Sequence, residues 1–258
     1  MAKIIAVVNQ KGGVGKTTST VNLAASVAVK GQRVLLIDID PQGNATSGLG
    51  INKRELKVSS YDVIINSMPI EKAIQKTDFE NLWLLPSNMN LAGAELELVD
   101  MQRRETKIKN AVASVKSQYD FIFMDCPPSL GLITLNALCA ADTVLVPIQC
   151  EYYALEGLSQ LMSTIRQVKR LYNPLIEMEG VLLTMYDGRL NLTHQVVNEL
   201  KRFFPKKVYS TAIPRNVKLS EAPSYGLPIH YYDKNSKGAA AYDALAEEFL
   251  KLNGKEVI

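Results

Sequence analysis

The segment NQKGGVGKTT, residues 9–18, packs glycines, lysines and threonines into one short run. Glycines let several backbone N–H groups converge on an anion, and the N-terminus of a following helix adds about half a unit of positive charge. In a phosphate-binding loop, Lys16 would reach the β- and γ-phosphates and the Thr17 hydroxyl would ligate Mg²⁺. We therefore predict a nucleotide site formed by Gly12, Gly13, Val14, Gly15, Lys16, Thr17 and Thr18.

The segment departs from the usual spacing, GxxxxGK[ST], because Gln10 occupies the first glycine position. A tight turn between a strand and a helix, without a ligand, is the alternative interpretation. The loop also carries a second lysine, Lys11, although one lysine suffices to bind phosphates. A solvated loop lysine is the plain interpretation of Lys11.

Carboxylates follow two apolar runs. Asp38 and Asp40 stand in DIDPQGN, and Asp125 begins DCPPS. The carboxyl ends of parallel strands meet at one edge of a sheet, where such folds bind ligands. An aspartate that ends an apolar strand suits the Mg²⁺ shell of a phosphate-transfer site. Each aspartate alone could be a helix cap or a turn residue, but together with the loop they favour a metal–nucleotide site.

Apolar runs alternate with helical patterns along the chain and predict an α/β fold. Several runs are apolar without alternation, as expected for strands covered on both faces. The pattern predicts a single domain over residues 1–258, with a doubly wound, mainly parallel sheet and helices on both faces. The predicted strands are Ile4–Val8, Val34–Ile37, Leu82–Leu85, Phe121–Met124, Thr143–Pro147, Gly180–Met185 and Val208–Ile213. The predicted helices are Thr17–Lys30, Leu91–Lys116 (broken near Met101), Leu132–Ala140, Leu155–Leu171, Thr193–Phe204 and Ala239–Leu252.

Composition adds few constraints. The chain has 258 residues, of which 47% are apolar and 21% charged, with a net charge of +3. Cys126, Cys139 and Cys150 form no CxxC and indicate buried thiols in a reducing compartment, not a metal cluster. No segment has the apolar run of a signal peptide or a membrane span, so we expect a cytoplasmic protein.

The motifs KGGVGKTT, DIDPQGN and DCPP, in this order, resemble those of the ParA/MinD family of deviant Walker A ATPases. The segments LNALCAADTVLVPIQCEYYALEGLSQL and IPRNVKLSEAPSYGLPI are most similar to the ParA/Soj branch. The resemblance covers nearly the whole chain and implies a P-loop NTPase fold with ATP and Mg²⁺ as cofactors. It also implies an ATP-sandwich homodimer, in which Lys11 contacts the nucleotide of the other subunit.

The resemblance implies roles for further residues. Asp40 would position or activate the attacking water, Asp38 would lie near Mg²⁺, and Asp125 would be the Walker B acid. Because Cys126 follows Asp125 where many motor ATPases have a glutamate base, we expect slow hydrolysis. Pro214 and Asn216 would contact adenine, although an ordinary turn is the alternative.

Basic residues gather late in the chain. Between Glu199 and Glu221 there is no acid, and Arg189 precedes the same region. Such a face would bind phosphates without reading bases, whereas a plain solvated face is the alternative. The resemblance implies non-specific double-stranded DNA binding at the nucleoid and a ParB-type stimulating partner. The candidate DNA-binding residues are Arg189, Lys201, Arg202, Lys206, Lys207, Arg215 and Lys218.

Other functions of the family fit less well. A MinD-like membrane switch needs a basic amphipathic C-terminal helix, whereas the tail AYDALAEEFLKLNGKEVI carries Asp243, Glu247, Glu248 and Glu256. The cysteines do not suit an iron–sulfur reductase, and a tyrosine-rich tail of a bacterial kinase is missing. The chain starts almost at its first strand, so we expect no additional N-terminal DNA-binding domain. Positioning of a protein cargo stays open.

Overall fold

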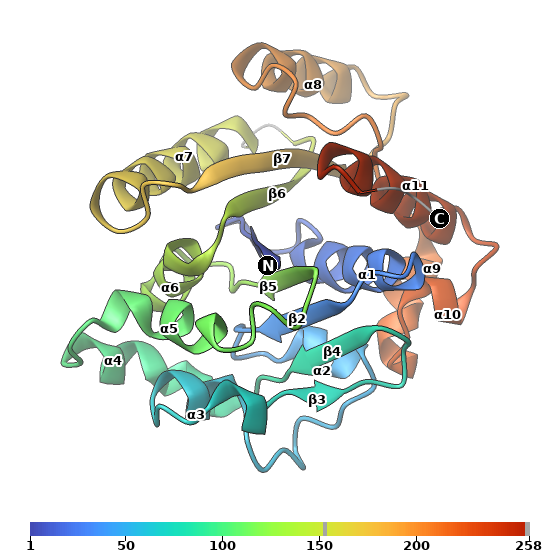
Figure 1. The fold of residues 1–258 in the computed structure, drawn as a ribbon. Helices are drawn as coiled ribbons and strands as arrows, with labels where there is room; N and C mark the ends of the chain where they lie inside the picture. The colour runs from blue at the N-terminus through green and yellow to red at the C-terminus, as the bar shows by residue number, and fades with distance from the viewer. Residues whose placement is uncertain (152–153, 256–258) are drawn as a thin grey trace.

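The structure is a computed structural model that describes residues 1–151 and 154–255. One seven-stranded sheet runs through it in the order β3-β4-β2-β5-β1-β6-β7 (Figure 1). The strands are β1 (Lys3–Val7), β2 (Val34–Asp38), β3 (Gln75–Lys76), β4 (Leu82–Leu85), β5 (Phe121–Asp125), β6 (Thr143–Gln149) and β7 (Glu177–Thr184). All neighbours pair in parallel except β3 with β4, as predicted for a mainly parallel sheet.

Helices connect the strands. The α-helices are α1 (Lys16–Val29), α2 (Asn44–Gly48), α3 (Ser60–Ile64), α4 (Ala94–Val99), α5 (Lys107–Ala113), α6 (Leu132–Ala140), α7 (Ala154–Leu171), α8 (Asn191–Phe203), α9 (Val217–Glu221), α10 (Ile229–Tyr232) and α11 (Lys237–Leu252). Short 3₁₀ helices are η1 (Ile70–Lys72), η2 (Met89–Gly93), η3 (Arg104–Thr106) and η4 (Ala222–Tyr225).

Each face of the sheet carries its own hydrophobic core. In β1, Ile4 and Ala6 point into the core that α3 to α8 share, whereas Ile5 and Val7 point into the core shared with α1 and α11. Every residue of β2 and β5 is buried. The strands are therefore covered on both faces, and the predicted doubly wound α/β fold is confirmed.

The predicted strand Val208–Ile213 is wrong. This segment meets β7 and the loop after it only in isolated bridges, between Val181 and Val208 and between Tyr186 and Pro214. Between these bridges, the backbone N–H groups of Ser210 and Thr211 donate instead to the Glu248 carboxylate, at 2.7 and 2.8 Å. Because these donors are taken by α11, the segment forms no continuous ladder with β7.

The predicted helix over Leu91–Lys116 divides into η2, α4, η3 and α5. Its interruption lies close to the break expected near Met101. Arg103 there adopts φ 52°, a left-handed conformation that an α-helix does not contain.

The C-terminal helix α11 packs against the body of the protein. Its residues Leu245, Phe249 and Leu250 are buried, and Lys30 of α1 pairs with Asp243 and Glu247. The apolar stripe of the tail is therefore part of the core, while Glu256 lies outside the described residues. Within the described ranges, we find no helix whose length and apolar content would let it cross a membrane.

Candidate nucleotide-binding site

The loop between β1 and α1 has the backbone of an anion site. Gly13 and Gly15 adopt φ 74° and 80°, a region that side chains other than glycine rarely enter. From Gly12 to Thr18, no backbone N–H donates a hydrogen bond to another described residue. These free donors at the start of a 14-residue helix suit the phosphates of a nucleotide.

The middle of the loop is fixed to the neighbouring strand. Val14 is buried, and its carbonyl accepts a hydrogen bond of 2.8 Å from the Thr184 hydroxyl at the end of β7. This bond holds the loop before any ligand arrives. Thr184 was not predicted from the sequence, because nothing near it in the chain marks the partner of a loop 170 residues away.

Lys16 lies inside the site. It is 6% exposed, and its Nζ donates to the Lys11 carbonyl at 2.9 Å. Burial lowers the pKa of Lys16, while the nearby Asp125 and Asp40 act in the opposite direction. To bind a phosphate, the Lys16 ammonium group would give up only its hydrogen bond to the Lys11 carbonyl.

The three predicted carboxylates meet beside the loop. Asp38 and Asp125 lie opposite each other on β2 and β5, and both are fully buried. Asp125 accepts hydrogen bonds from the hydroxyls of Thr17 and Thr20 at 2.8 and 2.9 Å. Asp40 is 7% exposed, and its carboxylate accepts from the Gln42 N–H at 2.9 Å.

Helix α2 holds Asp38. The carboxylate of Asp38 accepts from the Thr46 N–H at 2.8 Å and the Thr46 hydroxyl at 2.7 Å, while the Ser87 N–H donates to that hydroxyl at 2.9 Å. Burial raises the pKa of Asp38 to about 6 and that of Asp125 to about 8. Carboxyls that resist ionisation in this way favour a cation that compensates their charge.

The donor set suits Mg²⁺ bound together with a nucleotide. The part of the chain described here holds no group of three or more His, Cys, Asp or Glu placed to enclose a metal ion. Mg²⁺ usually takes one or two protein ligands and completes its shell with phosphates and water. The Thr17 hydroxyl and Asp125 would hold it on the protein side, with Asp38 nearby, and the ion would neutralise phosphate charge.

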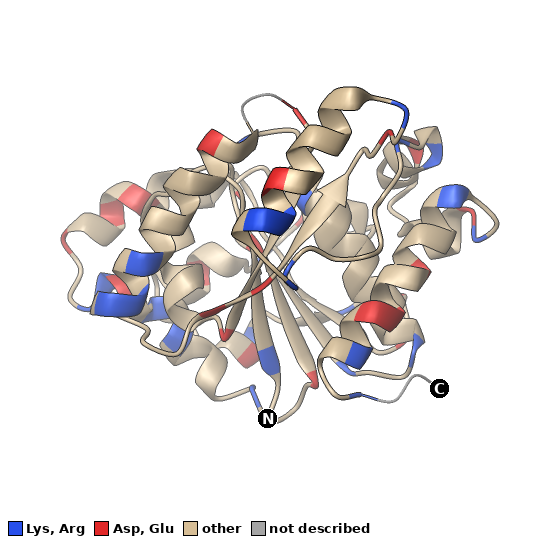
Figure 2. Cartoon of the chain, turned by 90° about the horizontal axis from the view of Figure 1, so that it is seen from above, with Lys and Arg blue, Asp and Glu red and all other residues tan. Residues whose placement is uncertain are grey.

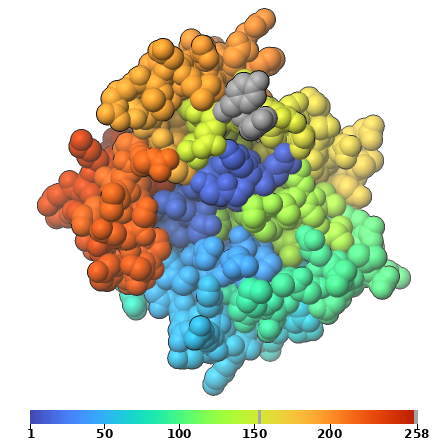
Figure 3. Space-filling model, turned by 180° about the vertical axis from the view of Figure 1, so that it is seen from behind, coloured from blue at the N-terminus to red at the C-terminus, as the bar shows by residue number. Residues whose placement is uncertain are grey.

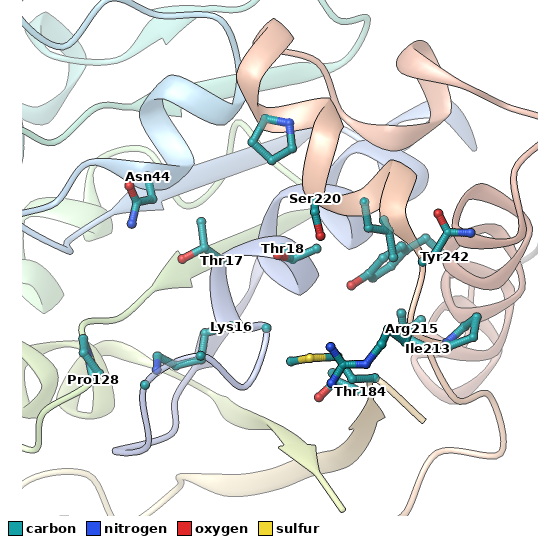
Figure 4. Close-up of a pocket in the computed structure, with 18 of the residues that line it drawn as sticks. Lys16, Thr17, Thr18, Asn44, Pro128, Thr184, Ile213, Arg215, Ser220 and Tyr242 are labelled. Atoms are coloured by element: carbon teal, nitrogen blue, oxygen red, sulfur yellow. The ribbon is translucent and has the colours of Figure 1, made fainter. Parts of the chain in front are cut away.

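A cavity of about 600 Å³ opens in front of the loop (Figure 4). Several predicted residues line it: Gly12, Gly13, Gly15, Lys16, Thr17, Thr18, Asp40, Pro214 and Asn216. The Asn216 Oδ1 accepts from the Lys218 N–H at 2.8 Å and caps α9, which leaves its amide N–H₂ for a ligand. Sequence reasoning missed Gln42, Asn44, Pro128, Ser220 and Tyr242, which come to the cavity from other elements.

Figure 3 shows this arrangement on the surface. The blue N-terminal segment lies in the middle of this face, with orange and red C-terminal segments on one side and green segments on the other. The cavity thus lies where segments from both halves of the chain meet, which accords with the rule that ligands bind at the carboxyl edge of such sheets.

Lys11 does not line that cavity. Its Nζ forms an ion pair with Glu151, in the segment between β6 and α7. It lines a second hollow of about 590 Å³ together with Gln10, Pro128 and Glu156. The two lysines of the loop therefore face different surroundings: Lys16 lies in the nucleotide cavity and Lys11 lies outside it.

The predicted DNA-binding residues lie on separate parts of the protein. Lys201 and Arg202 are on α8, Lys206 and Lys207 follow it, and Lys218 is on α9, at another corner of the fold (Figure 1). Arg215 lines the nucleotide cavity. In Figure 2 basic and acidic residues are interspersed over several elements.

Some of these basic groups have partners within the chain. Arg189 pairs with Asp187 at 2.6 Å, Lys218 with Glu221 at 2.9 Å, and Arg202 lies 3.9 Å from Glu199. The Lys207 Nζ donates to the Met178 carbonyl at 2.7 Å. The basic residues of the acid-free segment between Glu199 and Glu221 therefore do not form one continuous basic surface.

A glycine-rich loop between an interior strand of a doubly wound sheet and a helix that begins at a lysine, beside aspartates that end neighbouring strands, is typical of P-loop nucleotide-binding proteins, and this chain is one of them. A family model described as an AAA domain matches residues 2–178. The chain is 57% identical over 248 residues to the sporulation initiation inhibitor protein Soj of Bacillus subtilis, covering 96% of this chain and 98% of that protein. It is 52% identical over 251 residues to the chromosome partitioning protein ParA of Myxococcus xanthus, covering 97% and 89%.

A solved structure supports the same assignment. The structure of cobyrinic acid a,c-diamide synthase from Mycobacterium smegmatis, with a bound ATP analogue and magnesium, matches with a TM-score of 0.87 and 38% identity, covering 97% of this chain and 95% of that one. The chain belongs to the ParA/Soj family of partition ATPases, whose nucleotide is ATP and whose metal is Mg²⁺.

Proposed function

We propose that this partition ATPase is a switch that dimerises on ATP, binds double-stranded DNA without sequence preference, and releases it when a ParB-type protein stimulates hydrolysis. The observation that carries the proposal is the separation of the two loop lysines. Lys16 is buried in the cavity of its own subunit, whereas Lys11 is half-exposed outside that cavity. A lysine so placed is available to the nucleotide of a second subunit.

The proposed roles follow the positions of the side chains. Lys16 and the loop N–H groups bind the phosphates, and the Thr17 hydroxyl with Asp125 holds Mg²⁺ near Asp38. Asp40 lines the cavity and orients the attacking water. Pro214 and Asn216 line the part of the cavity that would take adenine. The two cores share one sheet, so residues 1–258 are proposed to act as a single ATPase domain.

Intrinsic hydrolysis is proposed to be slow. Cys126, next to Asp125, is buried, and burial together with Asp125 raises the pKa of its thiol well above the ordinary value. A neutral thiol is no general base for water at neutral pH. The ATP state would therefore persist until a partner completes the site, as a switch requires.

DNA binding in the dimer is proposed to use α8 and the loop before it. Among the described residues, Lys201 and Lys206 form no ion pair, and Arg189 is exposed on a pair with Asp187 that DNA phosphates could replace. Arg215 is better explained by the nucleotide cavity that it lines. Localisation at the nucleoid would follow from this binding.

Salt dependence tests the DNA proposal. The ATP-trapped protein should bind duplexes of unrelated sequence alike, with log affinity falling against log salt by about 0.9 per phosphate contact. Arg189→Ala or Lys201→Ala should weaken all duplexes and make the slope shallower by roughly one unit. Lys72→Ala is the matched control, since η1 lies by the opposite edge of the sheet and should leave the slope unchanged.

Anionic liposomes serve as the competing surface in the same assay. ATP-dependent binding to liposomes without binding to DNA would overturn the DNA proposal and favour a membrane-cycling switch. Binding to neither would favour the positioning of a protein cargo.

A further inference from the structure

The start of the phosphate loop contacts both α7 and the segment that leads into α7. The Gln10 side chain donates to the Gln160 side chain of α7 at 2.5 Å, and the Lys11 ammonium pairs with Glu151. Both charged side chains of that pair are partly open to solvent, with 38% and 45% of their surfaces exposed. Lys11 in a single subunit is therefore turned toward its own chain.

A third contact links Lys11 to the nucleotide site. The Lys16 Nζ donates to the Lys11 carbonyl at 2.9 Å. Phosphates that bind Lys16 would take this donor, because a charge-assisted bond to a phosphate oxygen is stronger than one to a carbonyl. Nucleotide binding would then release the backbone of Lys11, while Glu151 would still hold its side chain.

A Lys11 side chain that turns toward the nucleotide of a second subunit would leave Glu151 of its own chain. We propose that Glu151 is a positioning residue, which holds Lys11 against its own subunit until an ATP-bound second copy competes for the lysine. This inference rests on the proposed ATP dimer. Glu151 would thus restrain dimerisation through its ion pair with Lys11, without contacting the nucleotide itself.

The restraint is modest, because exposed ion pairs are weak. Removing such a pair corresponds to about a two- to fivefold change in an equilibrium constant. A homodimer breaks one such pair in each of its two subunits, so Glu151→Gln should lower the dimer dissociation constant with ATP by about the square of that factor, roughly four- to 25-fold. Turnover per dimer at saturating protein should stay as in the wild type, because the pair is already broken in the dimer.

Chemical cross-linking tests the contact directly. A carbodiimide joins an amine and a carboxylate only where they touch, so the nucleotide-free wild-type protein should give a Lys11–Glu151 isopeptide in mass spectrometry. The cross-link should disappear with a non-hydrolysable ATP analogue and Mg²⁺ at protein concentrations that give the dimer. Glu156→Gln is the matched control. It removes an acid from the same hollow, and both the cross-link and the dimer dissociation constant should stay at the wild-type values.

Different results separate the two proposals. A wild-type protein that forms no dimer with ATP overturns the proposed function and, with it, the role of Glu151. A normal ATP dimer that keeps the cross-link, or a Glu151→Gln dimer that is no tighter than that of Glu156→Gln, overturns the role of Glu151 alone.

Discussion

Thr46 links the buried acid Asp38 to the rest of the fold, and replacing it with valine tests that link. Valine keeps the shape of threonine but removes the hydroxyl, which donates to the Asp38 carboxylate at 2.7 Å and accepts from the Ser87 N–H at 2.9 Å. Both Thr46 and Asp38 are fully buried, so water cannot replace either bond.

The two losses add. A hydrogen bond to a buried charged group contributes about 1.5–3 kcal/mol, and a buried donor left without a partner costs about 1–3 kcal/mol. Because the Thr46 N–H still donates to Asp38, we expect the lower part of the sum, about 3 kcal/mol of unfolding free energy. For a chain of this size, that corresponds to a fall in Tm of about 6–12 °C.

Urea unfolding of the nucleotide-free protein at pH 7.5 measures the effect. Thr46→Ser is the matched control, since it keeps the hydroxyl and removes one buried methyl group, worth about 0.8 kcal/mol. If Thr46→Val is as stable as Thr46→Ser, the bonds to Asp38 and Ser87 do not hold α2 as described.

The remaining predictions concern the nucleotide site. Lys16→Ala should abolish ATP binding, because the β- and γ-phosphates lose their main side-chain charge, and unchanged affinity in calorimetry would exclude that role. Asp40→Ala should bind ATP and dimerise but lose at least 100-fold in turnover, about the contribution of a general base, so hydrolysis at the wild-type rate would remove Asp40 from the handling of water. The raised pKa values of Asp38, about 6, and Asp125, about 8, mean that folding favours their protonated forms. Their contribution to stability is full below the ordinary carboxyl pKa and is lost as pH rises through these values. The Tm of the nucleotide-free protein should thus fall between pH 5 and 8.5, less steeply in Asp125→Asn, and a Tm that is flat or rises would contradict this.

The parts of the fold that the sequence predicted well are those with long apolar runs. β2, β4 and β5 were placed to within a residue because their residues are buried on both faces and show no alternation. The segment at 208–213 (VYSTAI) is also rich in residues that favour strands, yet the Glu248 carboxylate of α11 accepts hydrogen bonds from the backbone N–H groups of Ser210 and Thr211. A contact between residues so far apart in the chain leaves no local pattern.

The same distinction applies to the site. The glycines, Lys16 and the aspartates stand in compact motifs, so their meeting at one sheet edge followed from topology. Thr184 and Tyr242 carry no motif and reach the cavity only through packing. The basic residues show that closeness in sequence does not ensure closeness in space. Lys207 and Arg215 lie near opposite ends of a segment that runs along β7, so they lie apart in the structure.

Lys11 is proposed to complete the nucleotide site of a second subunit. Sedimentation with saturating Mg²⁺ and ATP tests it most directly, in an Asp40→Ala background that preserves the triphosphate. We expect Asp40→Ala to sediment as a dimer, whereas Asp40→Ala with Lys11→Ala should bind ATP but stay a monomer at the same concentration. A double variant that dimerises as well as Asp40→Ala would show that Lys11 makes no contact across the dimer and is an ordinary surface lysine.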